Sequence, residues 1–345
     1  MAASAGSRGG CRYFGGNSRP PAVVLPVVRC AVRRSAFVLA TLSTLCLLLF
    51  QAGCDLEGII ESSDRYREDF QYSFDLKPGG RLVVENFNGS IEIIGWEKQS
   101  VQITGTKYAG REEMLRELRI ETRADANSVV VRTVRPSGYH GNMGARYSIR
   151  VPRQVRLERI ASSNGQIRVE DIQGEARLET SNGTVVLRRI EGRVDAHTSN
   201  GRIEADSVTG DMITRTSNGS IRLARITGAI EANTSNSSIV AQISKPRPAA
   251  PLRFESSNGS IEVTLETLEG NDVRASTSNS SITVRLPESV KARLRASTSN
   301  GSISSDFDVT MRGAMSKNHL EGQINGGGPL IDLSSSNGAI RILRQ

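Results

Sequence analysis

The sequence predicts an all-β fold, a parallel, single-stranded β-solenoid of the β-helix type, with about 18–22 residues and two short strands in each rung. Three observations support this: a repeat of fixed period, apolar–polar alternation within each repeat, and glycines at the expected turns. An asparagine, usually within Ser-Asn-Gly, marks the repeat at spacings of 18 residues and later of 22, 21 and 21. The marked residues are Asn164, Asn182, Asn200, Asn218, Asn236, Asn258, Asn279, Asn300 and Asn337.

Within a regular rung, the residues three, five and eight places after the asparagine are apolar, and most of those twelve and fourteen places after it are too. Such alternation is typical of two half-buried strands. A glycine lies ten places after each of the first four asparagines, and it should form the turn between the strands because glycine tolerates positive φ. These turn glycines are Gly174, Gly192, Gly210 and Gly228.

One rung cannot bury its apolar face alone, so the rungs should stack repeat on repeat, with parallel strands about 4.8 Å apart. We expect the asparagine side chains to form a buried ladder in which each amide is hydrogen-bonded to the next. Right-handed coiling is expected, because parallel crossovers are right-handed. A propeller is disfavoured, since its blades need about 40 residues. Ser237 and Ser280 replace the corner glycine at two rungs, where we expect strain or a different geometry.

Residues 1–53 are predicted to be a signal peptide. Arg33 and Arg34 precede an apolar run over residues 36–50, which is short for a membrane span. The following Ala52-Gly53-Cys54 resembles the end of a bacterial lipobox, although Gln51 stands where such signals usually have Leu. The resemblance implies cleavage before Cys54 and lipid attachment to its thiol. Residues 54–65 would then be a lipid-anchored tether.

Residues 66–150 are predicted to be an N-terminal β cap with the first irregular rungs, since open solenoid ends are normally capped. Asn88 lies in a divergent copy of the repeat, and residues 111–117 are the one good candidate for a short helix. Residues 151–345 form the predicted solenoid repeat domain. In it, the proline-rich segment 245–251 should bulge from the stack. The glycine-rich segment 322–328 should be a loop, and the rung that holds Asn337 ends the chain.

The net charge of +8 does not indicate a nucleic-acid partner. Six of the 44 basic residues and none of the acids lie in residues 1–53, which leaves 38 basic against 36 acidic residues. The mature chain is therefore close to neutral. All four cysteines lie within the first 54 residues, so the rest of the chain cannot hold a disulfide framework, a cysteine-rich zinc site or a thiol nucleophile.

The sequence contains no pattern typical of a catalytic, metal or cofactor site. The three histidines, His140, His197 and His319, have no partner at metal-ligand spacing. Glu170 and Asp171 are the only adjacent acids in the regular rungs, and paired carboxylates could cleave a polysaccharide. From Val155 onward, however, the sequence has no Trp or Tyr to support a sugar ring. We therefore do not expect an enzyme.

The strand over residues 147–152, the Ser-Asn-Gly rungs and the stretch that begins at Pro329 resemble a family of bacterial envelope proteins. That family carries a β-strand-repeat domain of unknown function labelled "putative adhesin". The resemblance covers residues 75–345 and implies an exported, non-catalytic protein, periplasmic or surface-facing. It would be anchored in the membrane and bind an envelope protein or polysaccharide as an adhesin or scaffold. The alternatives are an accessory component of an envelope-stress or signalling system and, least favoured, a carbohydrate-active β-helix.

Overall fold

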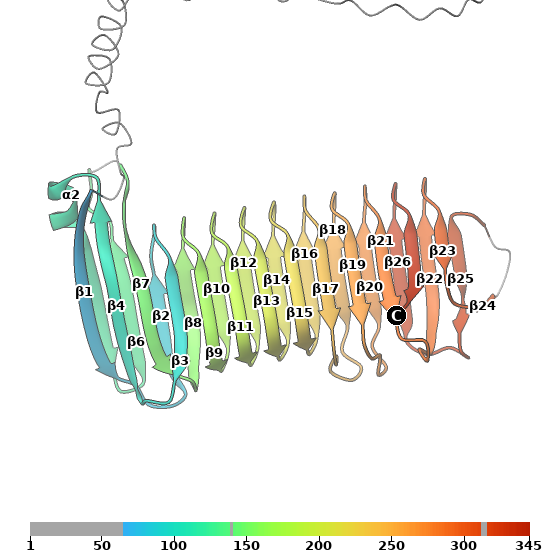
Figure 1. The fold of residues 1–345 in the computed structure, drawn as a ribbon, viewed down its shortest axis with the longest axis horizontal. Helices are drawn as coiled ribbons and strands as arrows, with labels where there is room; N and C mark the ends of the chain where they lie inside the picture. Colours follow the sequence, from blue (N-terminus) through green and yellow to red (C-terminus); the bar gives the residue numbers. More distant parts are fainter. Residues whose placement is uncertain (1–64, 139–140, 312–315) are drawn as a thin grey trace, which may run out of the picture. The chain divides into compact units, whose positions relative to one another are not determined.

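The computed structural model describes residues 65–138, 141–311 and 316–345. These residues form two mostly parallel β-sheets of 13 and 14 strands, stacked face to face as a row of two-strand rungs (Figure 1). The predicted all-β parallel solenoid is confirmed. Among the described residues, no helical segment has the length and apolar character of a membrane span.

The first sheet contains one strand of nearly every rung. In spatial order its strands are β1 (Tyr66–Asp75), β4 (Ser100–Ala109), β7 (Met143–Pro152), β3 (Ile91–Trp96), β9 (Ile167–Gln173), β11 (Val185–Glu191), β13 (Ile203–Thr209), β15 (Ile221–Thr227), β17 (Ile239–Ile243), β19 (Ile261–Leu265), β21 (Ile282–Leu286), β27 (Ile340–Arg344) and β23 (Ile303–Ser305).

The second sheet faces the first. From the end that lies opposite β1, its strands are β5 (Arg119–Asp125), β6 (Ser128–Val134), β2 (Gly80–Glu85), β8 (Val155–Ser162), β10 (Ala176–Thr180), β12 (Val194–Thr198), β14 (Met212–Thr216), β16 (Ile230–Thr234), β18 (Leu252–Ser256), β20 (Val273–Thr277), β26 (Leu330–Ser335), β22 (Ala292–Thr298), β25 (His319–Ile324) and β24 (Val309–Met311). The predicted short helix forms α2 (Glu112–Glu117).

The core lies between the two sheets and consists of columns of equivalent side chains. Val185 pairs with Ile203 and Ile203 with Ile221, and all three are fully buried. Alternate residues along each strand face outward, so that a strand such as β10 reads buried, exposed, buried, exposed, buried. The apolar columns expected from the alternation are therefore the core of the solenoid.

A residue with positive φ inside the strands of the first sheet explains the three-residue step between the apolar positions five and eight places after each of the first four asparagines. The residue seven places after the asparagine has a φ between 53° and 60° in four successive rungs, at Asp171, Arg189, Ser207 and Arg225. This residue is left out of the pairing in each of these rungs, so the register is kept and the next apolar side chain turns back into the core. From β17 on the strand has five residues, and the register shifts between β15 and β17.

At the C-terminal end, the rungs do not stack in chain order. β27 pairs with β21 on one side and with β23 on the other, although β23 precedes it in the sequence. In the same way, β26 lies between β20 and β22. The rung that ends the chain is therefore not the last rung of the stack, and it is inserted between the two rungs that precede it.

The N-terminal end has the same arrangement. β3 lies between β7 and β9, and β2 lies between β6 and β8, so that the first rung of the chain is the second in space. Antiparallel strands complete both ends: β1, β4 and β5 at the N-terminal end, and β25 with β24 at the C-terminal end.

Two expectations about irregular segments have different outcomes. Residues 245–251 lie outside both sheets, as the prolines indicate. The prediction that residues 322–328 form a loop is wrong in part, because residues 322–324 belong to β25. Gly322 fits there because a Cβ at this position would lie 2.5 Å from the Val309 side chain and 2.8 Å from the Thr310 carbonyl oxygen, in the neighbouring strand.

The glycines serve two purposes, of which the sequence indicated one. Gly192 in the second turn has a φ of 146°, in agreement with the predicted need for positive φ. The Ser-Asn-Gly glycines do not have positive φ, so they are needed for a different reason. A Cβ at Gly201 would lie 1.7 Å from the carbonyl oxygen of Gly183, so this corner has no room for a side chain unless the backbone moves, whereas the rungs of Ser237 and Ser280 accept one.

Candidate binding surface

The asparagines marked in the sequence form one continuous ladder along a corner of the stack. In most steps, the side-chain NH₂ donates to the side-chain oxygen of the preceding rung at 2.6–2.7 Å, as from Asn200 to Asn182. Asn88 extends the ladder at its beginning. At the other end, Asn337 donates to Asn279 and accepts from Asn300, which follows the spatial order of the rungs.

The ladder is exposed to solvent, so the expectation that it would be buried is wrong. The buried polar group at this corner is the hydroxyl two residues before each asparagine. Thr198 donates to the Gly183 carbonyl oxygen at 3.1 Å, and its oxygen accepts from the Gly201 N–H at 3.1 Å. This hydroxyl joins two successive corners, whereas the asparagines tie the rungs together at the surface.

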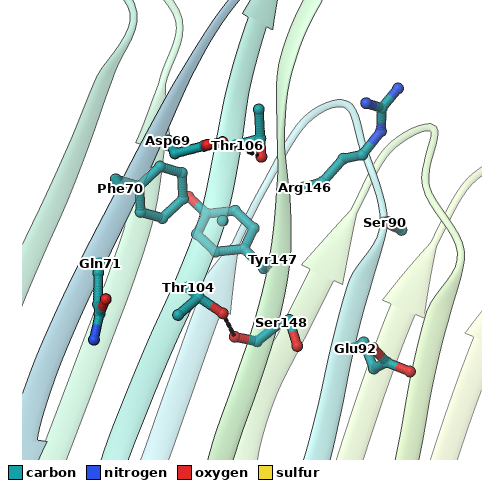
Figure 2. Close-up of a pocket in the computed structure, with 11 residues that line it drawn as sticks. Asp69, Phe70, Gln71, Ser90, Glu92, Thr104, Thr106, Arg146, Tyr147 and Ser148 are labelled. Atoms are coloured by element: carbon teal, nitrogen blue, oxygen red, sulfur yellow. Dashed lines mark hydrogen bonds between the residues drawn. The ribbon is translucent and has the colours of Figure 1, made fainter.

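A hollow of about 720 Å³ lies on the outer face of the first sheet, where β1, β4, β7 and β3 run side by side (Figure 2). Its polar lining includes a hydrogen bond of 2.6 Å from the Thr106 hydroxyl to Asp69 and one of 3.1 Å from the Thr104 hydroxyl to the Ser148 carbonyl oxygen. It is lined by Asp69, Phe70, Gln71, Ser90, Glu92, Thr104, Gly105, Thr106, Arg146, Tyr147 and Ser148.

Packed aromatic rings support the hollow from the core side. The Phe70 and Tyr147 rings meet edge to face, with centroids 5.4 Å apart. Phe70 covers Gly105, where a Cβ would lie 2.4 Å from the ring. The Tyr147 hydroxyl shares a buried hydrogen bond of 2.6 Å with Thr133, and burial raises its pKa. Tyr147 is thus a neutral structural group that holds the two sheets together.

We did not predict this hollow from the sequence, although Gly105, inside an expected strand, could have indicated that another group packs closely there. Glycine inside a strand often marks a close approach of another group.

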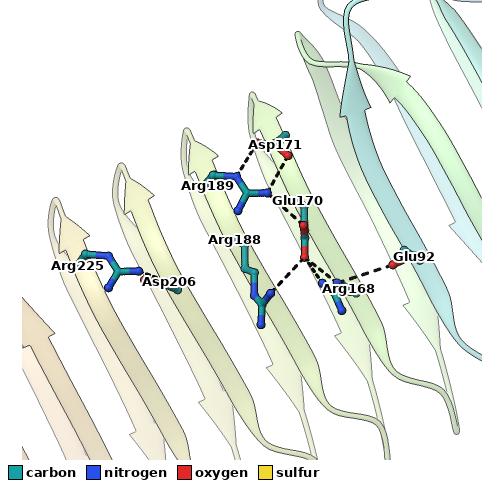
Figure 3. Close-up of polar contacts among 8 residues, drawn as sticks. All are labelled: Glu92, Arg168, Glu170, Asp171, Arg188, Arg189, Asp206 and Arg225. Carbon is teal, nitrogen blue, oxygen red and sulfur yellow. Dashed lines mark hydrogen bonds and ion pairs between the residues drawn. The ribbon is translucent and has the colours of Figure 1, made fainter.

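The adjacent acids Glu170 and Asp171 lie beside the hollow in a network of arginines (Figure 3). The Glu170 side chain is 12% exposed and is ion-paired with Arg168 at 2.5 Å, Arg189 at 3.1 Å and Arg188 at 3.8 Å. Arg168 also reaches Glu92, at 3.7 Å, and so connects this network to the lining of the hollow. Each acid of the pair is therefore neutralised by basic neighbours.

The geometry around Asp171 opposes a role for this residue as a general acid. Arg189 binds its carboxylate with two hydrogen bonds, of 2.7 and 2.9 Å, and these hold the pKa of Asp171 below its usual value. A general acid in glycoside cleavage needs a raised pKa instead. Asp171 therefore does not fit the role of that general acid.

The remaining candidate residues are not brought together. His197 is exposed on β12, and His319 lies 3.9 Å from Glu321 at the C-terminal end. No group of metal-ligating side chains occurs among the residues that the structure describes. Cys54 and His140 lie outside those residues, so lipid attachment remains a prediction.

A family model described as Toastrack DUF4097 matches residues 82–343. No curated protein matches the chain.

Solved structures with similarity to the chain include a putative cell adhesion protein from Clostridium sporogenes, with 12% identity over 81% of this chain and 100% of that one, and a TM-score of 0.21. Two others are putative adhesins from Parabacteroides distasonis (8% identity, 79% and 97% coverage, TM-score 0.36) and Parabacteroides merdae (10%, 81% and 97%, 0.39). These identities and scores are too low for a function to be carried over.

Proposed function

Because the chain belongs to the Toastrack DUF4097 family, we propose that it is a non-catalytic cell-envelope protein that binds a protein or polymer partner, as an adhesin or an envelope scaffold. The observation that carries this proposal is the hollow on the first sheet. It has a polar lining of hydroxyl, amide and charged groups, and it continues through Glu92 into the arginine network. Hydrogen-bonding groups on a rigid sheet can hold a partner without reacting with it.

The charges outside the hollow favour the same function. Across successive rungs of the first sheet, acids and bases alternate and pair, as in Arg222 with Glu204 at 3.8 Å and Arg225 with Asp206. Exposed pairs of this kind contribute little to stability. The paired charges leave a face without a strong electrostatic potential of one sign. Such a face suits a neutral polysaccharide or a protein surface that carries charges of both signs.

A substitution that fills the hollow tests the proposal. Ser148 faces outward in the hollow, and Ser304 has the equivalent outward position in β23, at the other end of the same sheet. Binding of the full chain to a panel of bacterial surface polysaccharides and a solubilised envelope protein fraction should be reduced by Ser148→Arg and unchanged by Ser304→Arg. Equal binding by both variants would show that the partner binds outside the hollow. Release of shortened glycan would refute the non-catalytic assignment.

The proposed envelope location is tested separately. If Cys54 carries the lipid, Cys54→Ser should abolish incorporation of a labelled fatty acid and release the chain from membranes. Cys46→Ser, within the apolar run, is the matched control and should leave both unchanged. Retention of Cys54→Ser in membranes without label would mean that the leader itself is the anchor.

A further inference from the structure

The N-terminal end of the stack exposes two strand edges. β1 is the outermost strand of the first sheet (Figure 1), and β5 is that of the second. Within the described residues, no strand pairs with the outer edge of either. Near the start of β1, the half-buried Tyr66 packs against the cluster that holds Met114 and Leu115 of α2. The stretch from Phe70 onward therefore remains the open part of the edge. Open edges invite pairing with another chain.

The charges of β5 are self-complementary. Its exposed side chains alternate in sign along the strand: Arg119, Glu121, Arg123 and Asp125. When two copies lie antiparallel with Thr122 opposite Thr122, each arginine faces an acid of the partner copy, and the twofold symmetry repeats both contacts. A shift by two residues in either direction places like charges opposite each other instead. The sequence of β5 thus favours one register of pairing with itself.

The first sheet is compatible with the same twofold axis. The Lys77 N–H donates to the Ala126 carbonyl oxygen at 3.0 Å, which places the ends of β1 and β5 at the same level. Four residues before these two lie Ser73 in β1 and Thr122 in β5. Since strands advance by about 3.3 Å per residue, an axis through Thr122 and perpendicular to the sheets also passes close to Ser73.

In that register, the core-facing side of β1 would gain apolar contacts. Phe70, Tyr72 and Phe74 face the second sheet but remain partly exposed, because β1 is at the end of the stack. Their rings form a row with centroids 5.8 and 6.3 Å apart. Around an axis at Ser73, Tyr72 would oppose Phe74 of a second copy, and Phe70 would oppose its Leu76. Aromatic cross-strand pairs of this kind stabilise antiparallel sheets.

We propose that the N-terminal end is a homodimer interface, at which a second copy of this chain pairs β1 with β1 and β5 with β5. The contact is isologous, as most dimer interfaces are. It extends both sheets without interruption and places the hollows of the two copies on the same face of one double-length stack. The dimer would therefore offer a partner two binding positions.

Charge reversal tests the pairing. The full chain in detergent micelles should sediment as a dimer, and either Glu121→Arg or Arg123→Glu should weaken the dimer by about tenfold or more, because each places two like-charge pairs in the interface. An equal mixture of the two variants should dimerise again, since each changed side chain then faces an opposite charge. Arg274→Glu, on the exposed face of the mid-stack strand β20, is the matched control and should dimerise as the unchanged chain does.

Cross-linking locates the axis independently. Ser73 is exposed, so Ser73→Cys should form a disulfide with its own counterpart under mild oxidation, identified by mass spectrometry as a peptide linked to itself. Ser334→Cys, in β26 near the opposite end of the stack, should not do so. The proposal is overturned by an unchanged chain that is monomeric, by single variants that dimerise normally, or by a dimer without the Ser73→Cys link.

Discussion

The middle and the ends of this solenoid are built from the same rung motif but follow different rules of order. Between β9 and β21, successive strands of the first sheet pair in the order in which they follow along the chain. At each end, a rung from near the chain terminus is inserted between two others. The motif therefore specifies how a rung folds, whereas the connections at the ends decide where it lies.

The inserted rungs affect how the ends of the stack are covered, a question that does not arise in the regular middle. If the chain stacked strictly in order, its last rung would expose one apolar end and two long strand edges. Here, the rung with Ile340 is covered on both sides, and the outermost strands β23 and β24 have only three residues each. Short edges limit unwanted pairing. The N-terminal end has long edges instead, which is the asymmetry from which we infer the dimer.

The largest expected effect is on the free energy of unfolding. It distinguishes a stack with the inserted rung from a stack in chain order. Ile340→Ala should lower the free energy of unfolding by roughly 2–5 kcal/mol, because Ile340 is fully buried between two rungs. Ile303→Ala should cost less, since Ile303 lies in the outermost strand and is only partly buried. Urea denaturation of both variants checks this. A stack in chain order would reverse the ranking, with Ile303 the more costly residue.

The next largest effect on stability concerns a close backbone contact in the middle of the stack. Gly201→Ala should destabilise the protein by roughly 3 kcal/mol, the upper part of the range for overpacking, because the new Cβ would meet backbone and not a side chain that can move. Gly110→Ala in the N-terminal cap is the matched control, since its Cβ would meet only an oxygen 3.9 Å away. Similar melting temperatures for the two variants would show that the corners have room to separate.

The difference between middle and ends also determines what the sequence could reveal. The 18-residue period, the apolar–polar alternation and the recurring asparagines are all visible when one repeat is compared with the next. The fold class and the ladder were therefore predictable. The three-residue step from Val169 to Ile172 already indicated an irregular residue between them. The order of the end rungs was not predictable. Asn279 is hydrogen-bonded to Asn337, 58 residues away, although the rung that holds Asn300 has the same motif and follows Asn279 more closely in the sequence. The hollow depends on β1, β4 and β7, which do not follow the repeat.

The ladder should show a smaller difference between middle and end. Asn200 takes part in two ladder hydrogen bonds, whereas Asn300, at the end of the ladder, donates one to Asn337. We expect Asn200→Ala to cost about 0.5–1.5 kcal/mol and Asn300→Ala about half of that, because the amides are exposed and water can replace a lost partner. Chemical denaturation measures both. A cost of several kcal/mol at Asn200 would imply that the ladder cooperates along its length.

The smallest effect concerns Asp171, at the boundary between the inserted N-terminal rung and the regular rungs. Its lowered pKa means that the hydrogen bonds from Arg189 stabilise the folded protein above the unfolded-state pKa of about 3.9. That contribution is lost as the pH falls through the lower folded-state pKa. Asp171→Asn keeps a residue that tolerates the observed φ of 60° but removes the charge.

The unchanged protein should therefore be more stable than Asp171→Asn at pH 7, by at most about 1 kcal/mol, since the pair is partly exposed. The difference should disappear at acidic pH and in the Arg189→Gln background. A difference that persists in either condition would mean that Asp171 acts through its positive-φ backbone and not through its charge. The row of positive-φ residues at Asp171, Arg189, Ser207 and Arg225 would then be a feature of the regular rungs that is independent of the arginine network.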